Sequence, residues 1–248
     1  MVNDRIARRR AEVRDDRRRR RLRRTILVVV LLALALVVAA IDRSDLVALA
    51  EVRVEGIQRL SALDVREAAD LELGTSTLRL RLGPAEERVE ALPLVADATV
   101  HRSDPLTVVI EVRERSPIAV AQGPRGAMLV DADGVVIAEG SEDGLPVIEV
   151  RGPLPALGRG VDVSPSLANA HAALLGLPGP LRSLVDRYVA VAADDLELHL
   201  ASGVVVRFGR AERIDEKARS LGAVLEDVGA TPVTAIDVRV PSRPVVVP

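Results

Sequence analysis

The sequence has 248 residues, and 48% of them are hydrophobic, which is enough apolar material for one or two folded domains. There is one Tyr, one Phe and no Trp, so the cores must be aliphatic, and single-stranded nucleic acid would find almost no aromatic side chain to stack on. Because the chain contains no Cys, disulfides, thiol nucleophiles and zinc–thiolate sites are excluded.

The formal net charge of -2 is the balance of two opposed regions. Residues 1–24 contain twelve Arg against four acidic residues and carry +8, whereas the rest of the chain carries -10. This basic arm has no apolar face, so we expect a solvated tail near anionic lipid headgroups, with an attraction of about 1 kcal/mol per Arg close to the surface. A cytoplasmic partner or a nucleic acid is an alternative, but nothing in the arm would read a base sequence.

The segment 25–41 contains no charged residue; twelve of its seventeen residues are Leu, Ile or Val and four are Ala. A helix of this length spans about 25 Å, slightly less than the roughly 30 Å hydrocarbon core of a bilayer, a difference that bilayer thinning and snorkelling arginines accommodate. The segment is therefore predicted to be a single transmembrane helix. A buried core helix is the weaker alternative, because nothing in this run offers a polar face.

A cleaved signal peptide also combines a basic start with an apolar run that ends in small residues, here Ala39 and Ala40. The basic arm is unusually long for a signal peptide, and the apolar run lies at the upper edge of the usual length, so a retained anchor is favoured. Because arginine-rich flanks stay in the cytoplasm, the 207 residues from Asp42 onward are expected outside it.

Residues 46–116 have the pattern of a small domain with the order β-α-α-β-β. A strand is predicted over 46–54, and a helix begins at Ser61, which has an acidic residue at capping-box spacing, and ends at a break near Gly74. A second helix begins near Pro84, because proline suits the first turn of a helix. Apolar and polar residues then alternate through 95–112 across a Ser-Asp-Pro turn, which predicts a hairpin.

Residues 117–240 are predicted to form a second domain, a mixed sheet with flanking helices. Asp133-Gly134 lies between two apolar runs, which is a strong signal for a two-residue hairpin. Asp131 and Asp133 also suggest a calcium loop, but Val135 stands where such a loop needs an oxygen ligand, so a turn is favoured. Further on, a helix is predicted from Ser164 to about residue 175.

Three short strands over 189–208 and an amphipathic helix over 214–228 follow in the second domain. Apolar residues recur in this helix at spacings of four, three, four and three before Gly229. Lys217, the only lysine of the chain, is predicted on the solvated side of the helix. A final alternating strand over Thr234–Val240 is followed by a proline-rich tail, residues 241–248.

The run LPLVADATVHRSDPLTVVIEVRERSPIAVA, residues 92–121, resembles the end of the POTRA domain in the FtsQ/DivIB family of bacterial cell-division proteins. The segments VDADGVV, ELHLASGVVVRFGR and TAIDVRVP resemble parts of the second domain of this family. A basic arm, one transmembrane helix, one POTRA domain and a second domain is also the layout of the family. The resemblance covers nearly all of residues 25–240 and implies an α+β fold.

The resemblance implies a non-catalytic scaffold of the divisome that links early and late division proteins and helps to control septal peptidoglycan synthesis. Its partners would be coiled-coil proteins of the FtsB and FtsL type outside the membrane, with FtsW and FtsI as further partners. No cofactor, metal or nucleic acid is expected. POTRA domains also serve in transport and envelope assembly, so such a module is the alternative function; its β-barrel would need aromatic girdles that two aromatic residues cannot supply.

The candidate partner site lies on the final strand, Thr234–Val240. One face of this strand is apolar, with Ile236, Val238 and Val240, and the other presents Asp237 and Arg239. A terminal strand is often an edge strand, whose free backbone groups suit the addition of a partner strand. The alternative is a strand that only closes its own sheet, with a loose tail.

The resemblance extends this docking role to particular positions of the chain. Arg239, Val240 and Ser242 match the docking region of the family, although Val240 and the prolines after it replace aromatic residues found in some relatives. Asp237 joins the candidate site as the charge partner of Arg239. An apolar contact from the tail completes the set: Val245, Val246 and Val247.

An enzyme is not expected. Triad chemistry needs a histidine beside a nucleophile and an acid, and the chain has only three histidines. His101 and His199 lie on predicted strands beside charged residues, where a solvated imidazole is expected, and His171 lies in mid-helix. The sequence contains no GxSxG elbow, SxxK pair, HExxH metal helix or GxxxxGK[ST] phosphate loop. The paired carboxylates Asp194 and Asp195 are more simply explained as part of a turn.

Overall fold

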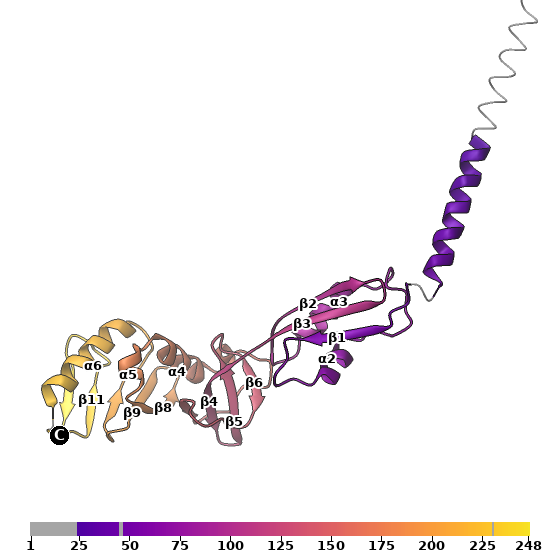
Figure 1. The fold of residues 1–248 in the computed structure, drawn as a ribbon. Coiled ribbons are helices and arrows are strands. Elements are labelled where there is room, and N and C mark those ends of the chain that lie inside the picture. The colour runs from indigo at the N-terminus through magenta and orange to yellow at the C-terminus, as the bar shows by residue number, and fades with distance from the viewer. Residues whose placement is uncertain (1–23, 45–46, 230) are drawn as a thin grey trace, which may run out of the picture.

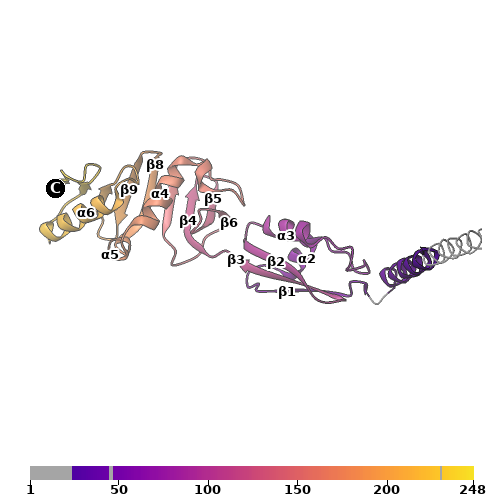
Figure 2. The same ribbon diagram turned by 90° about the horizontal axis from the view of Figure 1, so that it is seen from above.

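The computed structural model describes residues 24–44, 47–229 and 231–248. An amino-terminal helix is followed by a small α+β domain and then by a larger domain built on a nine-stranded sheet, so that the molecule is elongated (Figure 1). Seen from above, the same three parts succeed one another along the molecule (Figure 2). Apart from Arg24, the predicted basic arm lies outside the described residues.

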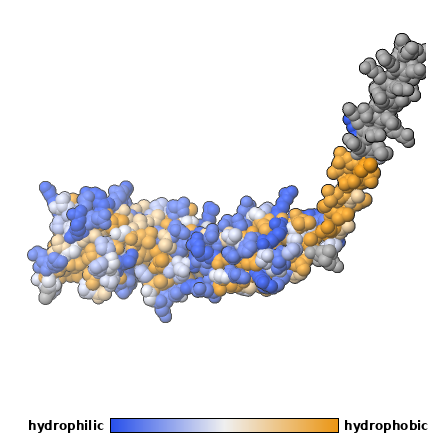
Figure 3. Space-filling view, turned by 45° about the horizontal axis from the view of Figure 1, so that its top comes forward, coloured by the Kyte–Doolittle hydropathy of each residue, from blue (hydrophilic) through white to orange (hydrophobic). Residues whose placement is uncertain are grey.

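The amino-terminal helix comprises 19 residues, Arg24–Asp42. Its apolar stretch is not buried against the rest of the protein. It is a continuous hydrophobic cylinder in the space-filling view (Figure 3). At 1.5 Å per residue this helix is about 28 Å long, which is close to the thickness of the hydrocarbon core. The prediction of a helix over 25–41 is confirmed, whereas the alternative of a buried core helix is wrong.

The small domain has the predicted order β-α-α-β-β. Its strands form one sheet in the order β1-β3-β2, with β1 parallel to β3 and β2 antiparallel to it. Valines, alanines and leucines from the helices and the sheet form one aliphatic core, as the near absence of aromatic residues requires. The elements are β1 (Glu51–Glu55), α2 (Ala62–Ala69), α3 (Leu82–Glu90), β2 (Val95–Asp104) and β3 (Thr107–Glu114).

The first strand and the first helix of this domain are shorter than predicted. The segment 47–49 pairs with the loop after α2 instead of with β3, and the amide of Leu49 donates to the Thr75 carbonyl over 2.9 Å. The strand therefore begins at Glu51. Helix α2 ends at Ala69, because Asp70 adopts the left-handed conformation, with φ of 50°, four residues before the glycine predicted to end it.

Ser61 caps α2 as predicted, but its hydroxyl binds the amide of the second helical residue and not that of the third, as a capping box would. The Ser61 hydroxyl accepts a hydrogen bond from the amide of Leu63 over 3.1 Å, so it satisfies one of the free donors at the start of the helix. Leu63 is the second residue of the helix. Asp64 is the third, and it lies at the capping-box position that the sequence indicated.

The second domain is a mixed nine-stranded sheet in the order β12-β11-β10-β9-β8-β7-β4-β5-β6, with helices packed against it. The predicted hairpin at Asp133-Gly134 joins β5 to β6, but its loop is longer than the two residues expected. The Asp131 amide donates to the Val135 carbonyl over 3.0 Å, and Gly134 alone takes a positive φ, 78°. Its elements are β4 (Pro117–Gly123), β5 (Gly126–Asp131), β6 (Val136–Glu139), β7 (Val147–Val150), η2 (Val161–Val163), α4 (Pro165–Gly176), α5 (Gly179–Arg182), β8 (Val185–Ala192), β9 (Asp195–Leu200), β10 (Val205–Arg207), α6 (Ile214–Val228), β11 (Ala235–Asp237) and β12 (Val245–Val247).

The main core of the second domain lies between the sheet and the helices α4 and α6. Both helices contribute apolar residues to it, together with Tyr188 and Phe208, the two aromatic side chains of the protein, which are fully buried. A smaller apolar cluster contains Val120, Leu129 and Ile137, and Leu94 of the small domain packs against it. This contact joins the two domains through apolar packing as well as through the chain.

Candidate partner-binding site

The carboxyl-terminal edge of the nine-stranded sheet differs from the prediction. Strand β11 pairs with β10 in parallel on one side and with β12 in antiparallel on the other, with Ile236 opposite Val206 and Val246. The outermost strand is therefore β12, formed by the segment 241–248 that was expected to be a tail. The chain reverses at residues 240–243, where the amide of Arg243 donates to the Val240 carbonyl over 3.0 Å.

The final strand is also shorter than predicted, because regular pairing of β11 stops at Asp237. Ile236 and Val238 are fully buried, as the alternation indicated, and the Val238 amide still donates to the Arg207 carbonyl over 3.1 Å. Val240 is 54% exposed, since it already belongs to the turn. The predicted apolar face therefore loses its third residue, and Val240 becomes part of the accessible surface.

Asp237 and Arg239 form the predicted charge pair. The guanidinium donates to both carboxylate oxygens, from Nη2 to Oδ2 over 2.6 Å and from Nε to Oδ1 over 3.1 Å, and the Arg239 amide donates to Oδ1 over 3.0 Å. The Arg239 guanidinium holds the pKa of the Asp237 carboxyl below its usual range. About half of the Arg239 side chain remains exposed, so the pair fixes the turn after β11 and still presents charge to solvent.

A hollow of about 580 Å³ lies beside this edge, between the outer face of α6 and the turn that leads into β12. Ser242 lines it, which brings one predicted site residue next to a helix that was not part of the predicted site. The polar face of α6, which is visible in the sequence, could have indicated that this helix lines the site, because the face opposite the buried stripe is free to contact a partner. The lining residues from α6 are Glu216, Arg219, Ser220, Ala223, Val224 and Asp227, and those from the turn are Pro241, Ser242 and Pro244.

The prediction that Lys217 is solvated is wrong. Its side chain is only 3% exposed, and Nζ donates to the carbonyls of Phe208 and Arg210 over 2.8 and 2.6 Å. Burial lowers the pKa of Lys217, and the charge of Arg213 lowers it further. The long aliphatic stem lets a lysine on the helix flank reach these carbonyls, so Lys217 fixes the turn after β10 to α6.

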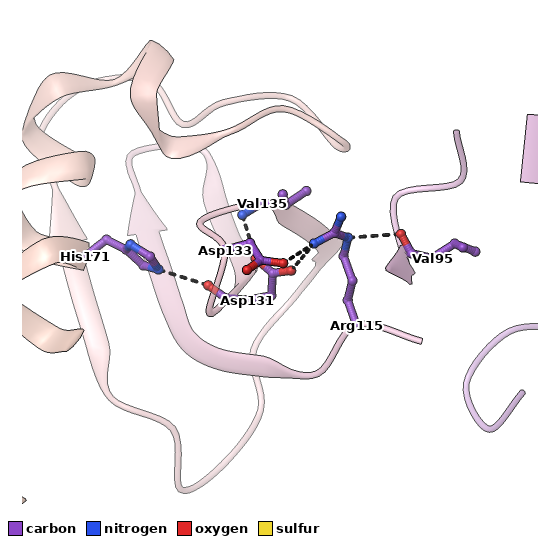
Figure 4. A network of polar contacts seen from close by, with 6 residues as sticks. All are labelled: Val95, Arg115, Asp131, Asp133, Val135 and His171. Carbon is purple, nitrogen blue, oxygen red and sulfur yellow. Dashed lines mark hydrogen bonds and ion pairs between the residues drawn. The ribbon is translucent and has the colours of Figure 1, made fainter. Parts of the chain in front are cut away.

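Three of the residues considered for metal binding or catalysis, Asp131, Asp133 and His171, lie near the junction of the two domains (Figure 4). Arg115 donates from Nη1 to Asp131 and Asp133 over 2.6 and 3.0 Å, and from Nε to the Val95 carbonyl over 3.0 Å. The ring nitrogen Nε2 of His171 lies 2.9 Å from the Asp131 carbonyl oxygen. The two carboxylates therefore serve a salt bridge between the domains, and no cluster of potential metal ligands occurs among the described residues.

The other two histidines lie on strands, as predicted, beside acidic residues. The ring nitrogen Nε2 of His101 is 3.9 Å from Glu111, and that of His199 is 3.3 Å from Glu197. Both side chains are partly exposed. Neither has a hydroxyl nucleophile among the hydrogen-bond partners that the described residues supply.

An apolar anchor helix, a β-α-α-β-β domain and a mixed-sheet domain with an open edge define a single-pass membrane protein that carries two α+β domains. Residues 47–115 match the model of the FtsQ-type POTRA domain, and residues 119–239 match that of the carboxyl-terminal domain of cell division protein FtsQ/DivIB. The chain belongs to the FtsQ/DivIB family of cell-division proteins.

Relatives from two groups of bacteria show the same similarity. The chain is 33% identical over 194 residues to cell division protein FtsQ of Mycobacterium leprae, which covers 78% of this chain and 54% of the relative. It is 31% identical over 214 residues to FtsQ of Streptomyces coelicolor, which covers 81% of this chain and 80% of the relative. The chain thus spans little more than half of the length of the mycobacterial protein. The extracytoplasmic domain of DivIB from Geobacillus stearothermophilus aligns with a TM-score of 0.33 and 12% identity, over 48% of this chain and 98% of that domain.

Proposed function

We propose that this protein is a non-catalytic scaffold of the divisome that links early and late division proteins and helps to control septal peptidoglycan synthesis. Its extracytoplasmic domains bind coiled-coil partners of the FtsB and FtsL type, and through them it acts on FtsW and FtsI. Family membership supports the role in cell division. The observation that carries the binding role is the open edge of the sheet at β12.

The edge strand has the properties that strand addition needs. β12 pairs with β11 on one side only, so its outer backbone groups are available for hydrogen bonds to a partner strand. Its three valines are 56%, 38% and 41% exposed, and their β-branched side chains favour the extended conformation. A partner strand laid along β12 would cover them, and backbone hydrogen bonds would set its register.

The hollow beside α6 offers a second contact for the same partner. Its lining combines the carboxylates of Glu216 and Asp227 with the guanidinium of Arg219 and with the apolar rings of Pro241 and Pro244. A helix of mixed charge with an apolar stripe fits such a lining, since both its charges and its apolar residues find complements. A coiled-coil segment that continues into a strand would occupy the hollow and the edge together.

The site is tested by a charge placed on the edge strand. Val245→Asp should weaken binding of the extracytoplasmic segment of an FtsB-type partner by at least about tenfold, which corresponds to about 1.4 kcal/mol. Binding is measured with the full chain in lipid nanodiscs. Val163→Asp is the matched control, because Val163 is 55% exposed and Val245 is 56% exposed, and it should leave the affinity unchanged. Equal affinity of the two variants would contradict a partner site on β12.

A further inference from the structure

The loop between α2 and α3 is held firmly against the start of the small domain. Thr77 is buried, and its amide and hydroxyl donate to the Val47 carbonyl over 2.7 and 3.0 Å. Arg102 donates to the carbonyls of Thr77 and Leu80, over 2.9 Å in each case. The backbone is therefore fixed on both sides of Leu78, and the position of this side chain is set by the fold.

Leu78 nevertheless points away from the core and is 63% exposed. A single exposed leucine is ordinary on a soluble protein, so its exposure alone indicates nothing. Its surroundings are more specific, because Leu78 lines a hollow of about 510 Å³ together with one stripe of the anchor helix. The stripe has helical spacing: Leu31, Leu34, Ala35, Val38, Ala39 and Asp42.

Polar contacts join the same loop to the end of the anchor helix. The Ser76 hydroxyl donates to Oδ1 of Asp42 over 2.7 Å, and Nε of Arg79 donates to Oδ2 over 2.7 Å. Asp42 is the last residue of the apolar helix, so these bonds place the loop at the level where the helix leaves the hydrocarbon core. The charge of Arg79 compensates the carboxylate at this boundary.

We propose that this loop is a second membrane contact, in which Leu78 inserts into the outer interface of the bilayer beside the last turns of the anchor helix. The inference rests on the membrane anchor, and goes beyond it by assigning a lipid contact to the POTRA domain. Lipid chains fill the hollow, because Leu78 on one side and the apolar stripe of the anchor helix on the other disfavour water. The side chain of Arg79 is 60% exposed although its guanidinium pairs with Asp42, and this group then lies at the height of the lipid phosphates, to which its remaining N–H groups can donate.

A second contact would restrict the orientation of the small domain. A single helix followed by a short connection leaves the domain free to tilt about the end of the helix. A leucine buried in the interface, together with the bonds from Ser76 and Arg79 to Asp42, removes much of this freedom. The long axis of the molecule would then keep a defined angle to the membrane, and the partner-binding edge at its far end would keep a defined direction (Figure 1).

The composition of the chain makes this inference directly measurable. Because the protein has no Trp, Leu78→Trp introduces a single indole ring, whose emission lies at longer wavelength than that of Tyr188. Because it has no Cys, a single introduced cysteine can also be labelled selectively. The full chain is reconstituted in phosphatidylcholine vesicles whose acyl chains carry bromine close to the headgroup, which quenches only nearby indole rings. Leu63→Trp is the matched control, because Leu63 is 59% exposed, much like Leu78. It lies on α2, and the start of this helix is hydrogen-bonded to the end of β3, away from the anchor helix.

We expect Leu78→Trp to emit at shorter wavelength than Leu63→Trp and to lose about half of its emission in the brominated vesicles, because insertion places the ring about 5–10 Å below the surface. Leu63→Trp should be unaffected by bromine. An equal response of the two variants would overturn the lipid contact. If neither protein floats with the vesicles, both the membrane anchor and the loop contact are overturned. The flotation result therefore separates a failure of the anchor from a failure of the loop contact alone.

A second reporter guards against a local change caused by the indole ring. Leu78→Cys carrying a nitroxide should collide readily with oxygen dissolved in the lipid and rarely with a water-soluble nickel chelate. The opposite ratio would overturn the proposal. An apolar environment that is found only after a second membrane protein is added would assign the hollow to a partner helix, and this outcome would also overturn the lipid contact.

Discussion

At the scale of single residues, Lys217 organises the region next to the candidate site. Its ammonium group lies 4.8 Å from the centre of the Phe208 ring and binds the carbonyls of Phe208 and Arg210. Gly209, between these two residues, lies in close contact with the aliphatic part of Arg239, since an added Cβ would come within 3.0 Å of Cγ. One buried cation thus supports the turn against which the charge pair of Arg239 rests.

Lys217→Met should lower the free energy of unfolding by about 2 kcal/mol, because the carbonyls of Phe208 and Arg210 lose a charged donor while the apolar volume is kept. The measurement is urea unfolding of the protein in detergent. Arg219→Met on the same helix is the control; its side chain is exposed, and the change should stay within about 0.5 kcal/mol. Equal effects of the two substitutions would show that the hydrogen bonds of Lys217 contribute nothing to stability.

Tyr188 is fully buried, and no described residue pairs with its hydroxyl. Tyr188→Phe should therefore leave the protein as stable or stabilise it by up to about 1 kcal/mol, since an unpaired buried hydroxyl is costly. Thermal unfolding of both proteins measures the difference. A clear loss of stability in Tyr188→Phe would show that the hydroxyl has a favourable partner.

The burial of Tyr188 also makes the stability of the protein depend on pH. It raises the pKa of Tyr188 to about 12, whereas a tyrosine of the unfolded chain titrates near 10. The folded state then holds the proton more tightly than the unfolded state, so stability is complete below pH 10 and falls as the pH rises towards 12. Because this is the only tyrosine, its ultraviolet absorbance reports the titration directly. A midpoint near 10 in the folded protein would contradict the prediction.

At the scale of elements, the proposed partner site depends on β12. If a partner adds to β12, removing residues 241–248 should abolish binding, because both the edge strand and one wall of the hollow are lost. The melting temperature should change little, since the three valines of β12 are more than one-third exposed. Binding of the extracytoplasmic segment of an FtsB-type partner to the truncated and complete chains measures the effect.

Unchanged affinity of the truncated chain would contradict a partner site on β12. Tighter binding would contradict addition to β12 and would show that the partner pairs with β11 in place of β12.

The variant Arg239→Glu separates the contribution of the charge pair to binding from that of the edge strand, because it keeps β12 but sets two carboxylates side by side. Equal affinity and equal stability of that variant would remove Arg239 from the site.

At the scale of the whole molecule, the junction between the domains holds them in one arrangement. Only Arg115 and Ser116 separate β3 from β4, and Arg115 binds Asp131 of the second domain. Glu114 accepts hydrogen bonds from three successive backbone amides at residues 58–60, and Arg59 forms an ion pair with Glu142. The edge at β12 therefore lies at the end of the molecule opposite the anchor helix, which is where a partner outside the membrane can reach it (Figure 1).

The orientation of the anchor follows from charge. Because residues 1–24 carry +8 and the chain beyond them carries -10, the amino terminus should stay in the cytoplasm. A reporter enzyme that is active only outside the cytoplasm should therefore work when fused after Ser116, between the two domains. Activity of a cytoplasm-only reporter at that position would contradict this orientation.

The cellular protein should also remain full length in the membrane fraction, whereas a soluble form beginning near Ile41 would identify a cleaved signal peptide.

Periodicity in the sequence was sufficient for most of the architecture. The apolar segment 25–41, the β-α-α-β-β order and the Asp133-Gly134 hairpin depend on local patterns, because helix and strand formation here need only the spacing of apolar residues and a suitable turn. The amphipathic helix at 214–228 was correct in its bounds for the same reason. The position of Ser61 at the start of a helix could likewise be read from spacing alone.

Contacts between residues distant in the chain were decided only by the tertiary structure. Lys217 was predicted on the solvated side because helical periodicity cannot show that two carbonyls of another segment lie within reach of its flexible stem. The valines of β12 follow two prolines, so their local pattern indicated a tail, and only the open side of β11 gave them a partner. The contact of Asp42 with Ser76 and Arg79 joins segments more than thirty residues apart, and such pairing depends on how the helices and sheets pack.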